Sequence, residues 1–489
     1  MKKNFIKIIS FVLLFALTIT VTLHALDFKY LDSTFKLDAF YDLPENSVDV
    51  LVLGSSHAYQ GINTAVMWNE YGYAAFDLCG AAQPIWNTYY YLEEALKTQT
   101  PKVIILDVYT LHYSGEYGET SFAIKNTYGL KWSDTKKEAI EVSFDHTDTG
   151  IQYYIDVLQY HSRYSDLNKT DFYPYQANRA MYENHKGFYC YFRSEAVKEP
   201  DLNGVNYINE MSDKSMFYYK MILELAESKN IPVIVTAIPF AAEPFHQGFF
   251  NQAEAVANDY GVPFYNFLTE YKEAIGLDYK TDFADNQHLN YLGNTKLTRF
   301  IANQLRVNYN IPDNRGNEKY VSWAKDAEVY YNQLENHNNS LITSAADYAP
   351  VLSNDRYTVI MTLSCHNYAN IPSNSKIIAN RILSSAGIKT APYDGGVWIL
   401  RNGEIDSYKH SPDEGYSKAV SLGKTDGALI KSEPFYDEDG TKYIFNRIYF
   451  NKQLKSKTDY GLNIFVYDEF TQSLVDVVCV DFTESTFRR

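Results

Sequence analysis

The sequence predicts an α/β fold, a parallel sheet with helices on both faces, preceded by a transmembrane helix and followed by a β-rich α+β domain. The first observation is a series of short, continuous apolar runs, which are typical of parallel strands buried on both faces. The second is that stretches of helical length separate these runs, as in repeated strand–helix units. The third is that the first two runs end in glycine and small polar residues, at the sheet edge where α/β proteins place their chemistry.

The elements of the first domain, residues 27–306, follow from this alternation after a connecting segment. Strands are expected at residues 48–56, 74–80, 102–109, 231–239 and 262–267. Helices are expected at residues 64–71, 84–98, 212–229, 251–260 and 288–305. The helix at 84–98 opens with a proline, which suits a first helical position because its missing N–H would have no partner there.

Residues 110–210 interrupt the alternation. They are rich in Tyr, His, Asn and Asp with weak periodicity, so we expect a large insertion over the carboxyl edge of the sheet. Aromatic faces over a polar cleft suit a sugar chain, and active-site lids are a common reason for loops of this size. We therefore expect Tyr173, Tyr175 and Tyr191 to contact substrate. The alternative is a packed helical subdomain with half-buried tyrosines.

Residues 1–26 are expected to be a signal-anchor. Three lysines precede an uncharged stretch of 19 residues, 8–26. At about 1.5 Å per residue this stretch spans roughly 28 Å, enough to cross a bilayer. The positive charge keeps the N-terminus in the cytoplasm, which makes the protein a single-pass cell-membrane protein with an extracellular catalytic domain. The alternative is a cleaved signal peptide, although Leu23-His24-Ala25 is a poor cleavage site.

The C-terminal third changes character. Residues 307–345 are expected to form a linker, marked by the polar, Pro- and Gly-containing stretch 310–317, and then a polar helix at about 318–338. From residue 346 to 489, β-type runs separated by Gly- and Asp-rich turns predict a mostly β accessory domain.

Charge and residue counts limit the partners. The net charge of −16 argues against nucleic acid, because phosphate binding needs a basic face. The 44 tyrosines suit carbohydrate contact but also ordinary surfaces and cores. Cys79, Cys190, Cys365 and Cys479 have no metal-like spacing, so we expect no metal and no other cofactor. Two disulfide bonds and buried free thiols both fit these four cysteines.

Two distant segments carry the candidate catalytic residues. Ser56 follows the first strand in Gly54-Ser55-Ser56-His57, and Asp285 lies three residues before His288 at the start of the last helix. A nucleophile, a base and a carboxylate that orients the base are the parts of a serine hydrolase or acyltransferase. Their joint occurrence at opposite ends of an α/β pattern favours Ser56, His288 and Asp285 as catalytic residues.

Each segment by itself has a simpler explanation. A Ser-Ser pair after a strand is usually a helix cap, and an Asp before a helix often is too. We interpret Ser55 as structural. His57 is an alternative base, although neighbours on a tight turn seldom face each other. Asp282 is an alternative orienting group.

These residues resemble the SGNH/GDSL hydrolase superfamily over about residues 48–306. Ser56 matches its nucleophile, Gly80 the glycine of its second block, and Asp285 and His288 its last block. Gly-Ser-Ser in place of Gly-Asp-Ser is similar to the membrane-associated branch with alginate O-acetyltransferase and D-alanine transfer proteins. The resemblance implies a flavodoxin-like sheet and a serine acyl-enzyme mechanism.

One block of the superfamily is missing. Its Gly-x-Asn-Asp, whose Asn donates to the oxyanion, has no counterpart after the third strand, which ends Asp107-Val-Tyr109. The backbone N–H groups of Ser56 and Gly80 are expected oxyanion donors. Losing a single donor costs roughly 3–4 kcal/mol in a known protease, so we expect a replacement for the missing one. Gln83 and Tyr109 are the nearest polar candidates.

The C-terminal domain resembles the interleukin-like EMT inducer domain over about residues 345–485. The matching features are the strand 461–467, the strand 474–482 with its Val-Asp-x-x-Cys pattern, and the glycine pair before Trp398. The resemblance implies a compact β-rich module that binds glycans. A scaffold or partner-binding role is an equal alternative.

Together these features predict an extracytoplasmic serine esterase or O-acyltransferase, transferring O-acetyl groups, that acts on a cell-surface polysaccharide. No acyl-CoA or nucleotide motif is visible, so a transferase needs an acyl donor outside the membrane. By resemblance to the alginate system, a membrane-bound O-acyltransferase partner is one source. The alternative from another class is a non-catalytic glycan-binding or polysaccharide assembly protein on a degenerate version of the same fold.

Overall fold

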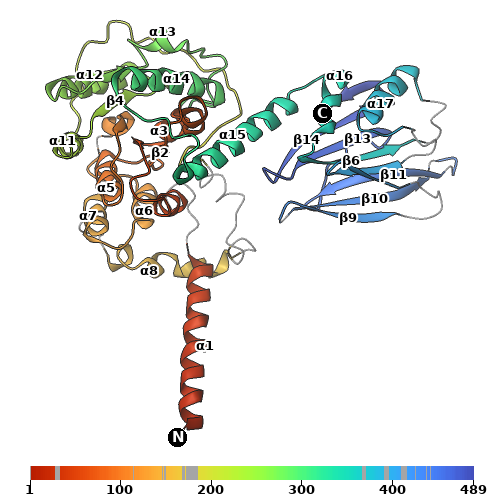
Figure 1. The fold of residues 1–489 in the computed structure, drawn as a ribbon, viewed down its shortest axis with the longest axis horizontal. Coiled ribbons are helices and arrows are strands. Elements are labelled where there is room, and N and C mark those ends of the chain that lie inside the picture. Colours follow the sequence, from red (N-terminus) through yellow and green to blue (C-terminus); the bar gives the residue numbers. More distant parts are fainter. Residues whose placement is uncertain are drawn as a thin grey trace. The chain divides into compact units, whose positions relative to one another are not determined.

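The chain folds into two compact units, Met1–Tyr330 and Tyr331–Arg489, in the computed structural model (Figure 1). The structure describes residues 2–27, 34–113, 115–145, 147, 150–167, 171, 185–365, 371–389, 396–408, 416–424, 426–436, 438–440 and 442–489.

The N-terminal helix α1 (Lys2–Leu26) contains a stretch, Phe5–Leu26, that is long and apolar enough to cross a membrane. Large apolar side chains such as Phe11 and Leu13 are exposed along it. This suits a helix surrounded by lipid, whose backbone groups are all paired within the helix. A signal sequence has the same length and composition, so the orientation of the chain stays a prediction.

The first unit is built on a five-stranded parallel sheet with the order β2-β1-β3-β4-β5. This is the strand order of flavodoxin-like folds. The strands are β1 (Val50–Leu53), β2 (Ala75–Asp77), β3 (Val103–Asp107), β4 (Val233–Ala237) and β5 (Phe264–Asn266). The predicted α/β class and parallel sheet are confirmed, and β1 lies inside the sheet between β2 and β3.

Both faces of this sheet are buried. Val50 and Val52 of β1 share a core with Leu297 of α14 (Tyr291–Asn308). Because side chains alternate along a strand, Leu51 and Leu53 point to the opposite face, and they are fully buried as well. On the sequence level this explains why the strand segments are continuously apolar rather than alternating.

Each of the five predicted helices overlaps a helix of this unit, whereas the short helices at residues 36–41, 56–61 and 272–275 were not predicted. Apart from α14, these helices are α2 (Lys36–Tyr41), α3 (Ser56–Gly61), α4 (Thr64–Val66) continuing into η2 (Met67–Tyr71), α5 (Ile85–Ala95), α11 (Asp213–Ser228), α12 (Pro244–Asp259) and α13 (Lys272–Ile275).

Some helix starts differ from the prediction. The first residue of α3, Ser56, was predicted as the last residue of a strand, and the rest of this helix was not predicted. Helix α12 starts well before residue 251, because Pro244 takes the first position inside a capping box made by Glu243 and His246. Helix α14 starts at Tyr291 rather than at His288, because the side chain of Asn290 accepts from the first free backbone N–H groups. His288 therefore lies in the turn before the helix.

The described part of the insertion at 110–210 contains helical segments. They are η3 (Tyr109–His112), α6 (Thr120–Tyr128), α7 (Asp134–Ser143), η4 (Ile151–Tyr153), α8 (Asp156–Tyr160) and η5 (His161–Ser165). Ala123, Ile140 and Phe144 form a small core of their own. This part is helical and packed, as the alternative of a helical subdomain requires, and the role of the insertion as a lid stays a prediction.

The first unit continues beyond residue 306. Short η6 (Glu318–Tyr320) leads into α15 (Val321–Ser340), and the division between the units falls within this helix. Trp323 is fully buried and its indole N–H donates to the carbonyl of Ala75 in β2 at 3.0 Å. The segment predicted to be a linker and polar helix thus packs its first helical turns on the sheet.

The second unit contains a six-stranded sheet, β15-β14-β13-β6-β7-β8, and a four-stranded sheet, β12-β11-β10-β9, both antiparallel. The strands are β6 (Tyr357–Ser364), β7 (Gly396–Arg401), β8 (Glu404–Tyr408), β9 (Ser417–Leu422), β10 (Asp426–Tyr436), β11 (Lys442–Phe450), β12 (Gln453–Leu454), β13 (Gly461–Asp468), β14 (Ser473–Asp481) and β15 (Thr486–Arg488). The helices are α16 (Ala345–Tyr348), η7 (Ala349–Ser353) and α17 (Ser373–Ser385). The β-rich character predicted for this region is confirmed.

The six-stranded sheet is covered on both sides. Ile360 and Phe465 on one face share a core with Ile430 and Ile448 of the four-stranded sheet. Side chains on the other face, among them Ile464, pack against α17. The unit is therefore layered, with helices, a long sheet and a short sheet in that order. All four cysteines of the chain are unpaired, and Cys79, Cys365 and Cys479 are buried, so the free-thiol alternative holds.

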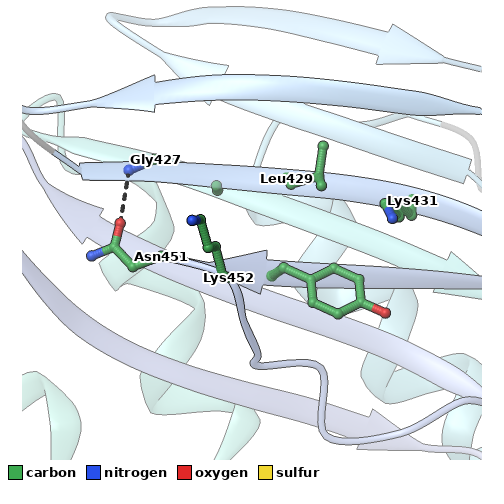
Figure 2. Close-up of a pocket in the computed structure, with 7 residues that line it drawn as sticks. Gly427, Leu429, Lys431, Asn451 and Lys452 are labelled. Atoms are coloured by element: carbon green, nitrogen blue, oxygen red, sulfur yellow. Dashed lines mark hydrogen bonds between the residues drawn. The ribbon is translucent and has the colours of Figure 1, made fainter.

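The hairpin that joins β11 to β12 borders a hollow of about 390 Å³ on the four-stranded sheet (Figure 2). The side chain of Asn451 ties this hairpin to the start of β10, because its carbonyl oxygen accepts from the N–H of Gly427 at 3.2 Å and its amide donates to Asp426 at 2.9 Å. Leu429 and Lys431 line the same hollow. The amide of Asn451 is therefore committed to holding the strands together.

Candidate active site

Ser56 occupies the first position of α3, directly after β1. Ser55 is the N-cap of this helix, and its hydroxyl oxygen accepts from the N–H of His57 at 3.4 Å. This cap explains why the second serine, rather than the first, has its hydroxyl free for chemistry. Since the strands are parallel, the turns after all of them gather at one edge of the sheet, and Ser56 lies at this edge after β1, between the turns that follow β2 and β3.

Gly54 makes this turn possible. Its φ is +144°, a conformation that side chains rarely adopt. A Cβ added there would lie 2.9 Å from Cβ of Asp107, at the end of β3. The backbone can therefore turn sharply beside the neighbouring strand only because this residue has no side chain.

His288 joins the two predicted segments. Its Nε2 lies 3.0 Å from Oγ of Ser56, and its Nδ1 lies 2.9 Å from Oδ1 of Asp285. When Nδ1–H donates to the carboxylate, Nε2 is the acceptor for the hydroxyl hydrogen. The structure thus brings the predicted nucleophile, base and orienting group together in a chain of hydrogen bonds.

The Asp-x-x-His spacing is the signature of a tight turn. Oδ1 of Asp285 accepts from the backbone N–H of Gln287 at 2.9 Å, and the carbonyl of His288 accepts from the N–H of Ala284 at 2.9 Å. A carboxylate that holds the backbone two residues on is an Asx turn. The same carboxylate is then positioned to meet the imidazole one residue later.

The local electrostatics keep the base neutral and its partner charged. Burial lowers the pKa of His288 below its ordinary value, and the Asp285 carboxylate only partly offsets this. Burial works to raise the pKa of Asp285, but the N–H of Gln287, the His288 ring and Arg193 together bring it below its ordinary value. At neutral pH the imidazole can therefore accept a proton beside an ionised carboxylate.

Arg193 is a residue that the sequence analysis missed. Its guanidinium lies 2.6 Å from the second oxygen of Asp285 and 4.7 Å from the ring centre of Tyr191. The turn at residues 284–288 is named the histidine turn. Backbone hydrogen bonds from Glu195 to Phe283 and from Tyr291 to Tyr191 hold the end of the insertion against it. No local pattern marks Arg193, because its role depends on this long-range pairing.

The predicted aromatic contacts of the insertion are only partly described. Tyr191 is partly exposed and its ring centre lies 6.1 Å from that of His288. It therefore borders the site, as expected of a substrate-contacting residue. Tyr173 and Tyr175 lie outside the described residues.

The predicted oxyanion donors have different surroundings. Gly80 is crowded, since a Cβ there would overlap Asn126 and would come 2.8 Å from Oε1 of Gln83. Gln83 is fully buried, turns this carbonyl oxygen toward Gly80, and donates from its amide nitrogen to Thr88 at 3.0 Å. This orientation is the reverse of the one that a donor from Gln83 to a substrate oxygen requires.

The hydroxyl of Tyr109, the other candidate for the missing oxyanion donor, already has a hydrogen-bond partner. It donates to Oε1 of Gln287 at 3.1 Å. The Gln287 side chain hydrogen-bonds to His57 as well, and this bond works to raise the pKa of His57 against the larger lowering by burial. Because Tyr109 holds the carbonyl oxygen of Gln287, the amide N–H groups of this side chain can donate to another acceptor. Gln287 lies in the histidine turn, one residue before His288.

The alternative catalytic residues are occupied elsewhere. His57 is 2% exposed and stacks on Tyr109 with ring centres 3.6 Å apart. Burial keeps the pKa of His57 well below its ordinary value. Asp282 pairs with Lys296 at 2.7 Å and accepts from the N–H of Asp278. The hydroxyl of Ser56 donates to Nε2 of His288, and Nδ1–H of His288 donates to Asp285, so neither alternative residue takes part in this series.

Lys36 supports the turn that carries Gly80. Its Nζ is buried, donates to the carbonyl of Cys79 at 3.1 Å and lies 3.2 Å from the ring centre of Tyr59. Asp77 is buried nearby, and burial raises its pKa well above the ordinary value although Lys36 works in the opposite direction. The sequence analysis placed residue 36 in a connecting segment, so this contact was not predicted.

Within the described ranges, no group of three or more His, Cys, Asp or Glu side chains is arranged to hold a metal ion. Comparison with protein-family models and with curated proteins gives no match for this chain. The assignment of a function therefore depends on the chemistry of the residues around Ser56.

The tight turn gives a direct prediction. Gly54→Ala should lower the free energy of unfolding by about 1–3 kcal/mol through backbone strain, plus the cost of the overlap with Asp107. Gly261→Ala is the matched control, because Gly261 also has a positive φ, +67°, but no atom lies within 4 Å of its added Cβ. Chemical denaturation of both variants measures the difference. Equal destabilisation would contradict the close approach of β1 and β3.

Proposed function

We propose that this protein is an extracytoplasmic serine esterase or O-acyltransferase of the SGNH type that acts on O-acyl groups, foremost O-acetyl, of a cell-surface polysaccharide. The observation that carries the proposal is the hydrogen-bonded series Ser56–His288–Asp285. Its order, its tautomer and the neutral state of the imidazole are those of an activated serine nucleophile.

In this mechanism Oγ of Ser56 attacks the ester carbonyl carbon while Nε2 of His288 takes the hydroxyl proton. Asp285 holds the imidazole in the required tautomer and stabilises its charged form. The tetrahedral intermediate collapses as His288 returns the proton to the leaving alcohol, which leaves an acyl-serine. Water then gives hydrolysis, and a sugar hydroxyl gives transfer, with His288 as the base in both cases.

The oxyanion is proposed to be stabilised by the backbone N–H groups of Ser56 and Gly80. The amide of Gln287 is proposed as the third donor, because Tyr109 holds its carbonyl oxygen and it lies beside His288 in the chain. Gln287 would then replace the asparagine that is missing after the third strand. A donor of this kind is worth roughly 10²–10³-fold in rate.

Polysaccharide is proposed as the substrate because the site carries aromatic side chains around the nucleophile and the chain is rich in tyrosine. The acyl donor of a transferase would be outside the membrane, for which a membrane-bound O-acyltransferase partner is one source. The second unit is proposed as an accessory module.

A series of variants tests the catalytic role. Ser56→Ala and His288→Ala should each lower kcat/KM on 4-nitrophenyl acetate by roughly 10⁴–10⁶-fold, and Asp285→Asn by less, because it misorients the base rather than removing it. A fluorophosphonate probe should label the protein and fail with Ser56→Ala. Ser55→Ala is the control, since it loses only a helix cap and should still be labelled.

The rival proposal, a non-catalytic glycan-binding protein, makes the opposite prediction. It requires that neither the unmodified protein nor any variant turns over the ester above background and that the probe does not label Ser56. It also requires that the protein binds polysaccharide saturably. Full activity in Ser56→Ala together with loss in Ser55→Ala would instead show that the nucleophile is Ser55.

The pH dependence of kcat/KM should depend on Arg193. His288 works as a base only when neutral, so the rate falls as the pH drops below its pKa. The positive charge of Arg193 lowers this pKa, and Arg193→Gln should therefore raise it and shift the acid limb of the profile to higher pH. Arg193→Lys keeps the charge and should shift the limb less. A shift of the limb to lower pH in Arg193→Gln would contradict this arrangement.

We further propose that α1 is an uncleaved anchor and that residues 27–489 lie outside the cell. The full-length protein should then stay with membranes through a carbonate wash, with its body open to external protease. Release of a soluble protein that begins near residue 27 would show that the helix is a cleaved signal sequence.

A further inference from the structure

A series of aromatic rings leads away from the proposed catalytic histidine. The ring of His57 lies 5.5 Å from that of His288, between centres, and stacks on Tyr109. Tyr109 in turn contacts Phe240 at 5.1 Å and His112 at 4.7 Å. His57 and Phe240 are buried, so this inner part of the series is a rigid core rather than a binding surface.

The outer part of the series reaches the surface. His112 is surrounded by Tyr113 at 4.8 Å, His246 at 5.0 Å, Phe245 at 6.4 Å and Phe249 at 6.5 Å between ring centres. These five side chains are named the aromatic platform. Each is at least partly exposed, and Phe245 is 42% exposed.

The platform lies at the same edge of the sheet as Ser56. His112 belongs to η3, which follows β3, and Phe245 lies in the first turn of α12, which follows β4. Because β1, β3 and β4 are consecutive neighbours in a parallel sheet, the turns after them are adjacent. The platform is thus continuous with the proposed site through Tyr109 and His57.

The two histidines of the platform are uncharged at neutral pH. Burial lowers the pKa of His246 to about 4 and lowers that of His112 from its ordinary value. Nδ1 of His246 accepts from the N–H of Glu243 at 3.0 Å, so its hydrogen is on Nε2. Nδ1 of His112 faces the carbonyl of Tyr109 at 2.5 Å and must carry the hydrogen, which makes its Nε2 an acceptor.

The platform therefore combines apolar ring faces with a neutral donor and a neutral acceptor on its two imidazoles and with the hydroxyl of Tyr113, which can do both. An alkyl chain would leave the polar ring nitrogens without hydrogen-bond partners. An anion would need a positive charge, which these neutral rings do not provide. A sugar ring has both an apolar C–H face and hydroxyl groups that donate and accept. The chemistry of the surface thus matches an uncharged pyranose.

We propose that the aromatic platform is a subsite for an uncharged sugar ring of the polysaccharide, next to the residue whose ester reaches Ser56. The inference rests on the proposed function for the identity of the reaction, but not for the binding of sugar. It places substrate contacts on α12 and on the first residues of the insertion, His112 and Tyr113, whereas the sequence analysis expected them at Tyr173, Tyr175 and Tyr191.

Steady-state kinetics of the full-length protein test the subsite. The probes are O-acetylated xylohexaose and 4-nitrophenyl acetate. Phe245→Ala should raise KM for the oligosaccharide about tenfold relative to that for the small ester, since a lost aromatic contact of about 1.4 kcal/mol corresponds to a factor of ten. Phe217→Ala is the matched control, because Phe217 is an equally large ring on α11 that is 57% exposed.

The control should leave both substrates unchanged. An unchanged oligosaccharide KM in Phe245→Ala, or an equal loss on both substrates, would overturn the subsite. A second variant, His246→Phe, keeps a ring but removes the Nε2–H donor together with the Nδ1 acceptor of the α12 capping box, and it should weaken binding of the oligosaccharide while leaving turnover of 4-nitrophenyl acetate unchanged.

Binding of plain xylohexaose to Ser56→Ala protein separates the two proposals. Saturable binding that Phe245→Ala weakens about tenfold supports the subsite even when no ester is turned over, and in that case only the proposed function fails. Absence of binding, or binding that is unaffected by Phe245→Ala, overturns the subsite whether or not the protein hydrolyses 4-nitrophenyl acetate.

Discussion

The hydrogen bond between His288 and Ser56 joins segments that are 232 residues apart, and the first unit is organised to keep it in place. One end depends on the turn at Gly54, where β1 approaches β3 too closely for any side chain. The other end depends on the Asx turn of Asp285 and on Asn290, which starts α14 just after the histidine. One end is thus fixed by close backbone packing and the other by side chains that accept from backbone N–H groups, and both hold the imidazole and the hydroxyl in place.

Around this bond, one charged carboxylate, that of Asp285, lies beside imidazoles that are uncharged at neutral pH. Burial keeps His288 and His57 uncharged, while backbone N–H groups and Arg193 keep Asp285 ionised. The ionised carboxylate is therefore the group against which an imidazolium would form during catalysis. The neutral histidines of the aromatic platform extend the same environment away from the nucleophile, so a polar but uncharged ligand is favoured there.

The insertion after β3 contributes two kinds of structure. Its helices α6 and α7 pack into a small core, which accounts for tyrosines as packing residues. Its last residues run beside the histidine turn and supply Arg193 and Tyr191 to the site. The insertion therefore packs as a small helical core in one part and lines the proposed site in another. Because both parts are rich in tyrosine, composition alone did not distinguish packing residues from residues at the site.

The sequence by itself determined the parallel sheet, the β-rich second region, the apolar N-terminal helix and the positions of Ser56, Asp285 and His288. These follow from local rules: continuous apolar runs, a glycine-serine turn and the spacing of an Asx turn each act within a few residues. Only the tertiary structure decided the roles of Arg193, Gln287, Lys36 and the aromatic platform, and the commitment of Gln83 to Thr88. Each of these depends on a partner from a distant segment, and no local pattern encodes which side chain a folded sheet edge brings alongside another.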